Sequence, residues 1–230
     1  MGPCTAPTLA PVLLLLDIDG TLVRGATDAH QRSLEEAIRD VFGAAPSTPP
    51  TDVAGRTDRW IMRDMLSREP VDASEVDERM DELCASAARA YGRLCEGSLA
   101  DTVLPGVRDG LRAFDDAGHR LALVTGNLEP IARLKLGRAG LGGWLDGVPG
   151  GFASDHELRA RLPGIARERA GNVPREEAVV IGDTPLDVAC AQADGVRCIA
   201  VTTGWFSAAE LLAAGADAVA SDLVEVAELV

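Results

Sequence analysis

Short continuous apolar runs recur along the chain, and each is followed by a polar residue or a Gly-Asp pair. They are residues 12–16 before Asp17, 121–124 before Thr125, 178–181 before Gly182 and Asp183, and 198–201 before Thr202. Apolar runs of this length are typical of parallel strands that are buried on both faces. Helical patterns separate them, with Pro130 and Pro185 where a first turn begins and Gly118 and Gly195 where a helix ends. The pattern therefore predicts an α/β fold with a doubly wound parallel sheet.

Residues 24–99 carry three helical patterns and no convincing strand. The first takes Thr27 or Asp28 as its cap, the second follows Thr57 and Asp58, and the third starts near Ser74. A loop is expected at residues 46–50. We therefore expect a small all-helical cap domain at 24–99, an α/β core made of 12–23 and 100–230, and a loose leader at 1–11.

Polar side chains come directly after three of the predicted strands. They lie in the segments Asp17-Ile18-Asp19-Gly20-Thr21, Thr125-Gly126-Asn127 and Gly182-Asp183-Thr184-Pro185-Leu186-Asp187. Because ligands bind at the carboxyl ends of strands in open α/β sheets, these segments are candidates for a binding site. A hydroxyl and the backbone N–H groups of a helix start also offer donors to an anion. Taken singly, the first two segments fit ordinary turns as well, and Asp187 fits an acid favoured in the first turn of a helix.

Composition excludes several classes of partner. The formal net charge is −14, whereas nucleic-acid binding needs clustered Lys and Arg, and an acidic protein is repelled by anionic membranes. The five cysteines are scattered without a CxxC pair, so we expect neither a disulfide framework nor a structural zinc site, and we expect Cys190 and Cys198 to be buried thiols. The run at 12–16 is too short to span a bilayer and lacks the features of a signal peptide. A cytoplasmic protein without nucleic-acid or membrane partners is predicted.

Taken together and in this order, the polar segments resemble the motifs of the haloacid dehalogenase superfamily. Residues 17–21 are similar to its first motif, Thr125 to its second, and Gly182 and Asp183 with Asp187 to its fourth. The resemblance runs from residue 12 onward and includes Leu-Pro-Gly-Val at 104–107 and Val-Thr-Thr-Gly at 201–204. The helical insert is similar to the cap of the phosphoglycolate-phosphatase-like branch.

The resemblance implies a Mg²⁺-dependent phosphatase that acts on a small phosphate monoester through an aspartyl-phosphate. In that scheme Asp17 is the nucleophile, and Asp19 protonates the leaving oxygen and then deprotonates water. The Mg²⁺ ligands would be Asp17, the backbone carbonyl of Asp19, and Asp183. Thr125, with Gly126 and Asn127 beside it, would bind phosphoryl oxygens. Asp187 would orient metal-bound water or brace Asp183.

The third motif is where the sequence departs from the family, which usually has a lysine there. Lys135 is the only lysine in the chain, and it falls on the helix after Thr125, which is the wrong element. Residues 154–161 are the expected region and offer Arg159 and Arg161. We expect Arg159 to bind the phosphate, with Arg161 as the alternative, because arginine keeps the positive charge and adds a bidentate fork.

The predicted cap leaves the substrate open among phosphoglycolate, sugar phosphates and nucleotides. Gly55-Arg56-Thr57 is similar to a cap segment that reaches the active site in relatives, so Arg56 either pairs with a substrate anion or is a surface arginine. His30 is expected to face solvent. The alternatives on the same scaffold are a sugar phosphomutase, disfavoured by the missing cap lysine, and a haloacid dehalogenase, disfavoured by Asp19. A catalytically silent module is disfavoured because Asp17, Asp19 and Asp183 are all present. The protein is expected to be a monomer or homodimer.

Overall fold

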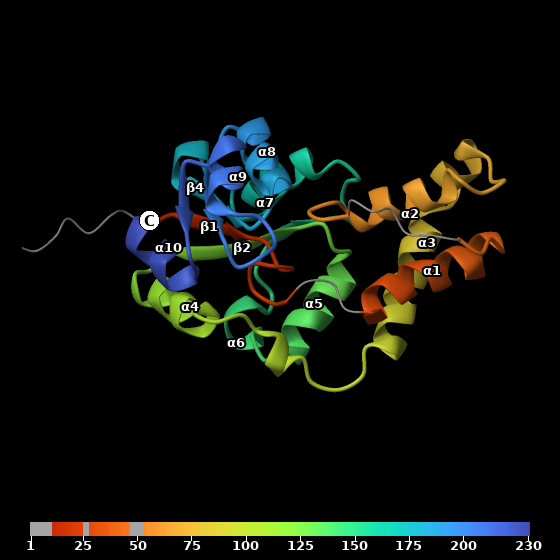
Figure 1. The fold of residues 1–230 in the computed structure, drawn as a ribbon, viewed down its shortest axis with the longest axis horizontal. Helices are drawn as coiled ribbons and strands as arrows, with labels where there is room; N and C mark the ends of the chain where they lie inside the picture. The colour runs from red at the N-terminus through yellow and green to blue at the C-terminus, as the bar shows by residue number, and fades with distance from the viewer. Residues whose placement is uncertain (1–10, 25–27, 47–52) are drawn as a thin grey trace, which may run out of the picture.

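The computed structural model describes residues 11–24, 28–46 and 53–230, and its centre is a six-stranded parallel sheet (Figure 1). The strands lie side by side in the order β3-β2-β1-β4-β5-β6, and every neighbouring pair is parallel. Their bounds are β1 Leu13–Leu16, β2 Arg120–Thr125, β3 Gly150–Phe152, β4 Ala178–Gly182, β5 Arg197–Val201 and β6 Ala218–Ala220. This order places β1 in the interior of the sheet, so the residues that follow it lie between the ends of β2 and β4.

The four leucines of β1 are buried on both faces of the sheet, which explains the uninterrupted apolar run. Leu14 and Leu16 belong to one hydrophobic core, whereas Leu13 and Leu15 belong to a second core on the opposite face. Successive side chains of a strand point to opposite faces, so each face receives two leucines. The predicted α/β class with a doubly wound parallel sheet is confirmed.

Helices cover both faces of the sheet (Figure 1). One face packs against α4 (Val107–Asp116), α5 (Glu129–Arg138), α6 (Gly142–Leu145) and α10 (Leu223–Leu229). The other packs against α7 (Leu162–Arg169), α8 (Pro185–Asp194) and α9 (Ala208–Ala213). Short 3₁₀ turns lie at η1 (Ala100–Thr102), η2 (Arg159–Arg161) and η3 (Arg175–Glu177). Among the described residues, no helix combines the length and apolar content needed to cross a bilayer.

Three helices between β1 and η1 form a separate lobe at one end of the sheet (Figure 1). They are α1 (Asp28–Phe42), α2 (Asp58–Leu66) and α3 (Ala73–Leu94). Thr57 caps α2 by accepting the N–H of Trp60. The lobe has its own hydrophobic core, which also takes in Leu128 and Ile131 from the start of α5. Residues 1–10 of the predicted leader at 1–11, the Thr27 cap and most of the predicted 46–50 loop lie outside the described residues.

The strands β3 and β6 were not predicted from the sequence. Each has three residues, and β3 contains Gly150 and Gly151, which carry no side chain to form an apolar pattern. They are strands because they pair with β2 and β5, and that pairing forms only in the folded protein. The predicted burial of Cys190 and Cys198 is confirmed.

Candidate active site at the carboxyl ends of the central strands

The segment after β1 is a tight buried loop, not a surface turn. Asp17 is 4% exposed, and its N–H donates to the carbonyl of Ile181 at 2.9 Å, which continues the pairing with β4. Gly20 adopts φ +89°, and a β-carbon there would collide with the carboxylate of Asp183. A left-handed backbone and close approach both require glycine at this position. The loop thus packs closely against Asp183, the residue that follows β4.

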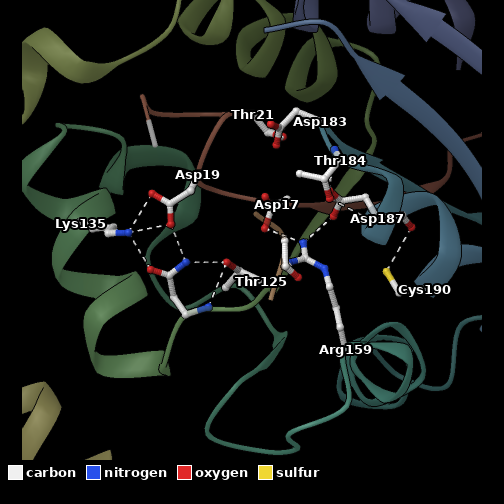
Figure 2. A network of polar contacts seen from close by, with 12 residues as sticks. Asp17, Asp19, Thr21, Thr125, Lys135, Arg159, Asp183, Thr184, Asp187 and Cys190 are labelled. Carbon is white, nitrogen blue, oxygen red and sulfur yellow. Dashed lines mark hydrogen bonds and ion pairs between the residues drawn. The ribbon is translucent and has the colours of Figure 1, made fainter. Parts of the chain in front are cut away.

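Three carboxylates meet at this point (Figure 2). Oxygens of Asp17, Asp183 and Asp187 lie within 4.8 Å of one another, and all three residues are buried. Burial, opposed by Arg159 and reinforced by Asp187, raises the pKa of Asp17 to about 7. Burial and the neighbouring Asp187 and Asp17 raise the pKa of Asp183 to about 8. Crowded anionic oxygens of this kind fit a hard divalent cation, which would offset the repulsion among them.

Asp187 is held by the helix that it starts. One carboxylate oxygen, Oδ2, accepts the N–H of Thr184 at 3.0 Å and its hydroxyl at 2.7 Å, which forms a capping box at the beginning of α8. The other oxygen, Oδ1, pairs with Arg159. Because both oxygens are engaged, Asp187 has less freedom to bind a metal directly than Asp17 or Asp183.

Arg159 reaches the carboxylates from η2 and is 8% exposed. Its Nη2 lies 2.9 Å from Oδ1 of Asp17, and its Nη1 donates to the carbonyl of Gly55 at 2.9 Å. Burial opposes the charge of this guanidinium, but Asp187 and Asp17 outweigh that effect and hold its pKa well above the usual value. Arg161 is exposed. Of the two arginines considered from the sequence, the structure brings Arg159 to Asp17.

Thr125 lies near Asp17 on the side that faces Lys135 (Figure 2), and Asn127 donates its side-chain amide to Asp19. Thr125 is fully buried at the end of β2, and its hydroxyl accepts the Asn127 side-chain amide at 2.9 Å. Gly126 lies against the start of α2: its carbonyl accepts the N–H of Asp58 at 2.7 Å, and a β-carbon on it would collide with the Arg56 carbonyl. The segment therefore connects the sheet to the helical lobe.

The structure brings Lys135 to the site, although the sequence assigned it no role there. Its helix was predicted correctly, but its Nζ donates to both oxygens of Asp19, at 2.8 and 2.6 Å. Burial alone would raise the pKa of Asp19, but Lys135, with hydrogen bonds from Lys135 and Asn127, lowers it. The available signal was a lone lysine that shares the buried face of its helix with Ile131 and Ala132.

His30 is also buried, at 5% exposed, and the prediction of a solvent-facing histidine is wrong. Its Nδ1 lies 3.2 Å from Nζ of Lys135, and its Nε2 lies 3.0 Å from Oδ1 of Asp58. The spacing could have revealed this placement, since Leu34, Ala37 and Ile38 follow it on the same helical face and are buried.

Arg56 points into a cavity at the junction of the lobe and the core. Its guanidinium carbon lies 4.3 Å from the centre of the Trp60 ring. The cavity has a volume of about 230 Å³ and is lined by Arg56, Trp60, Glu157, Arg159 and Leu186, among others. Arg56 is half-buried, so a plain surface position does not describe it.

Residues 14–192 match the haloacid dehalogenase-like hydrolase family. That span contains every strand-end residue described above and covers well over half of the chain. The chain belongs to this family. The predicted family, including its phosphoglycolate-phosphatase-like branch, is confirmed.

The curated relatives of this family member are phosphatases by name. The protein called phosphoglycolate phosphatase, plasmid, of Cupriavidus necator is 30% identical over 230 residues, which covers 96% of this chain and 90% of the relative. The phosphoglycolate phosphatase of Chromobacterium violaceum is 29% identical over 219 residues and covers 93% of each chain. The predicted class of enzyme, a hydrolase of phosphate monoesters, is confirmed.

Solved structures share the fold. A variant of CbbY from Rhodobacter sphaeroides, in complex with xylulose-(1,5)bisphosphate, matches with a TM-score of 0.68 and 21% identity and covers 94% of this chain and 96% of its own. A predicted phosphatase from Clostridium acetobutylicum matches with a TM-score of 0.67 and 20% identity, over 96% and 98% of the two chains. Both include the lobe as well as the sheet in the matched length.

Proposed function

We propose that this hydrolase is a Mg²⁺-dependent phosphatase of small phosphate monoesters of the phosphoglycolate or sugar-phosphate type. The observation that carries the proposal is the position of Asp17: a buried carboxylate between Asp183, Arg159 and Thr125. A nucleophile there has a cation on one side, hydrogen-bond donors on the other and room for a divalent ion.

The metal would be held by the carboxylates of Asp17 and Asp183 and by the backbone carbonyl of Asp19. These are hard oxygen donors, as Mg²⁺ prefers. Asp187 would act through Arg159 and Thr184, since those residues occupy its two oxygens. When bound, the ion would supply the positive charge that lets a phosphate dianion approach this acidic site.

In the first step, a carboxylate oxygen of Asp17 would attack phosphorus while the bond from phosphorus to the leaving oxygen breaks. Asp19, a carboxylate in the free site, would take up a proton from solvent when the phosphate dianion binds and give it to that oxygen, so the product leaves as an alcohol. Arg159, Thr125 and the N–H groups of Gly126 and Asn127 would hold the transferring phosphoryl oxygens.

In the second step, water would attack the aspartyl-phosphate, and Asp19 would accept the proton of that water. The bond between Asp17 and phosphorus then breaks and releases inorganic phosphate. Asp19 then releases that proton to solvent, and both residues return to their starting protonation states.

The helical lobe would cover the site as a cap at residues 24–99 and select the substrate. Two relatives named phosphoglycolate phosphatase cover nearly the whole chain, which makes phosphoglycolate the first substrate to test. Arg56 would attract the carboxylate or second phosphate of the substrate from the cavity at the lobe junction. Cys84, Cys95, Cys190 and Cys198 are free thiols, which suits a reducing compartment, and we place the enzyme in the cytoplasm.

The deciding experiment is a screen of phosphorylated metabolites, with Mg²⁺ and with EDTA, that measures release of inorganic phosphate. We expect turnover only with the metal, and a preference for small acidic or sugar monoesters. The Asp17→Asn variant should release no phosphate from any substrate, and its free energy of unfolding should match that of the wild type. Full turnover in EDTA, or activity of Asp17→Asn, would refute the proposal.

A further inference from the structure

Lys135 is a buried cation that the proposed chemistry does not use. Its side chain is almost fully buried, and its Nζ contacts three residues: Asp19, Asn127 Oδ1 at 2.7 Å, and His30 Nδ1 at 3.2 Å. An ammonium group has three N–H donors, and three partners account for them. Lys135 therefore has no donor left for a substrate, so any part it has in the reaction must act through a neighbour.

The contacts of Lys135 lead into the helical lobe. Because an ammonium faces Nδ1 of His30, that nitrogen must be the acceptor, and the ring proton lies on Nε2. Nε2 lies 3.0 Å from Oδ1 of Asp58, near enough for an electrostatic contact although its direction is poor for a hydrogen bond. Oδ2 of Asp58 accepts the N–H of Leu128 at 2.8 Å. His30 belongs to α1 and Asp58 to α2, so two lobe helices meet a helix of the core at this lysine.

Lys135 also fixes the direction of the Asp19 side chain. Asp19 Oδ1 accepts from Lys135, and Oδ2 accepts from both Lys135 and Asn127. The carboxylate is turned toward α5 and lies apart from the cluster of Asp17, Asp183 and Asp187 (Figure 2). Its side chain is still 21% exposed, so a bound ligand could reach it.

We propose that Lys135 is a positioning residue that orients Asp19 for proton transfer, and that His30 and Asp58 hold Lys135 from the lobe. This inference rests on the proposed phosphatase function and on Asp19 as its acid. Proton transfer then depends on α1 and α2 lying against α5, since their displacement removes His30 from Lys135. The Lys135 ammonium group thus couples the position of the lobe over the substrate to the orientation of Asp19.

Leaving-group dependence tests the proposal, because an aryl oxygen of low pKa departs without a proton and an alkyl oxygen does not. We compare kcat/KM for an alkyl phosphate and for p-nitrophenyl phosphate in the wild type and in Lys135→Met, which keeps the length and removes the charge. The alkyl reaction should fall about 100-fold, the usual contribution of a positioned acid, and the aryl reaction far less. Equal losses for both substrates in a folded variant would mean a purely structural lysine and would overturn the proposal.

A matched pair at His30 covers the case in which Lys135→Met does not fold. In His30→Asn the amide oxygen takes the place of Nδ1 and can accept from Lys135, whereas His30→Leu offers no acceptor. We expect His30→Asn to keep the wild-type ratio of alkyl to aryl kcat/KM, and His30→Leu to lower it. The same ratio in both variants would overturn the role of His30.

Asp17→Asn, assayed beside these variants, separates the two levels of inference. If it is inactive while the leaving-group ratio is constant in the Lys135 and His30 variants, the phosphatase proposal stands and the positioning role fails. If it retains activity on both substrates, the proposed function itself fails.

Discussion

Nη2 of Arg159 lies 2.9 Å from Oδ1 of Asp17, and the same nitrogen pairs with Asp187. One guanidinium thus balances two of the three clustered carboxylates from a position 8% exposed. Lys135 has the matching role on the other side, where it contacts Asp19. Two buried cations therefore organise the acidic site. Neither lies at a strand end: Arg159 comes from η2 and Lys135 from α5.

Arg159 and Arg161 should differ sharply in their effect on catalysis. Arg159→Ala removes the cation beside Asp17, and we expect kcat/KM to fall by at least about 100-fold, as for loss of one preorganised donor to the transition state. Arg161→Ala changes an exposed residue and should leave kcat/KM close to wild type. Steady-state kinetics on the substrate found in the screen checks both. A larger loss at Arg161 would move the phosphate contact to that residue.

Mg²⁺ should stabilise the folded protein, because it binds carboxylates that crowd one another only in the native state. At a metal concentration of about 100 times Kd, the free energy of unfolding should rise by about 2.7 kcal/mol. Asp183→Asn should lose most of that increase and should be at least as stable as the wild type in EDTA. Thermal unfolding of both proteins with and without Mg²⁺ measures this. An equal Mg²⁺ effect in the two proteins would contradict the placement of the ion.

In EDTA, the stability should fall as the pH rises from about 4 toward 8. The folded-state pKa values of Asp17 and Asp183 are raised to about 7 and about 8, so the native state holds protons that the unfolded chain has already released. The slope of unfolding free energy against pH is therefore negative in this window for these two groups. Asp183→Asn should flatten it. Urea titrations across the window test the sign, and an unchanged slope in the variant would show that these carboxyls are not its source.

Gly126 should not tolerate a methyl group. Its β-carbon would meet the carbonyl of Arg56 and the Cα of Thr57, both of which are backbone atoms that cannot move aside cheaply. We expect Gly126→Ala to push the start of α2 off the strand end, lowering kcat/KM and stability together. Gly137→Ala is the matched control: its β-carbon meets nothing within 4 Å, and the change should add roughly 0.5–1 kcal/mol of helix stability. Similar behaviour of the two variants in unfolding and kinetics would argue against this close approach.

The pair between Arg63 and Glu157 should couple the lobe to the loop that leads to Arg159. Nε of Arg63 donates to both Glu157 oxygens, at 2.9 and 2.8 Å, and the pair is partly exposed. A double-mutant cycle with Arg63→Met and Glu157→Gln should give a coupling of about 1 kcal/mol in unfolding free energy, near the upper end for exposed pairs. A coupling near zero would show that solvent screens the contact fully. Arg112 and Asp109, an exposed pair within α4, provide the comparison.

Much of the candidate site was predictable, because the order of residues along the chain is enough to place it. Asp17 and Thr125 each follow an apolar run, and a parallel sheet brings the ends of its strands to one edge. Arg159 was harder, since η2 is a short turn without periodicity; the sequence favoured it over Arg161, and only the structure shows it beside Asp17. The same limit explains β3 and β6, whose short segments become strands only through their neighbours.

The sequence by itself determined the sheet, the family and the strand-end acids, because apolar periodicity and short motifs record local geometry. Tertiary structure alone decided the partners of Lys135 and His30. Their contacts join α1, α2 and α5 across long stretches of chain, and a buried charge is stable only where folding supplies its counter-charges. An isolated lysine on an apolar helical face shows that such a partner must exist, and only the packed lobe identifies it.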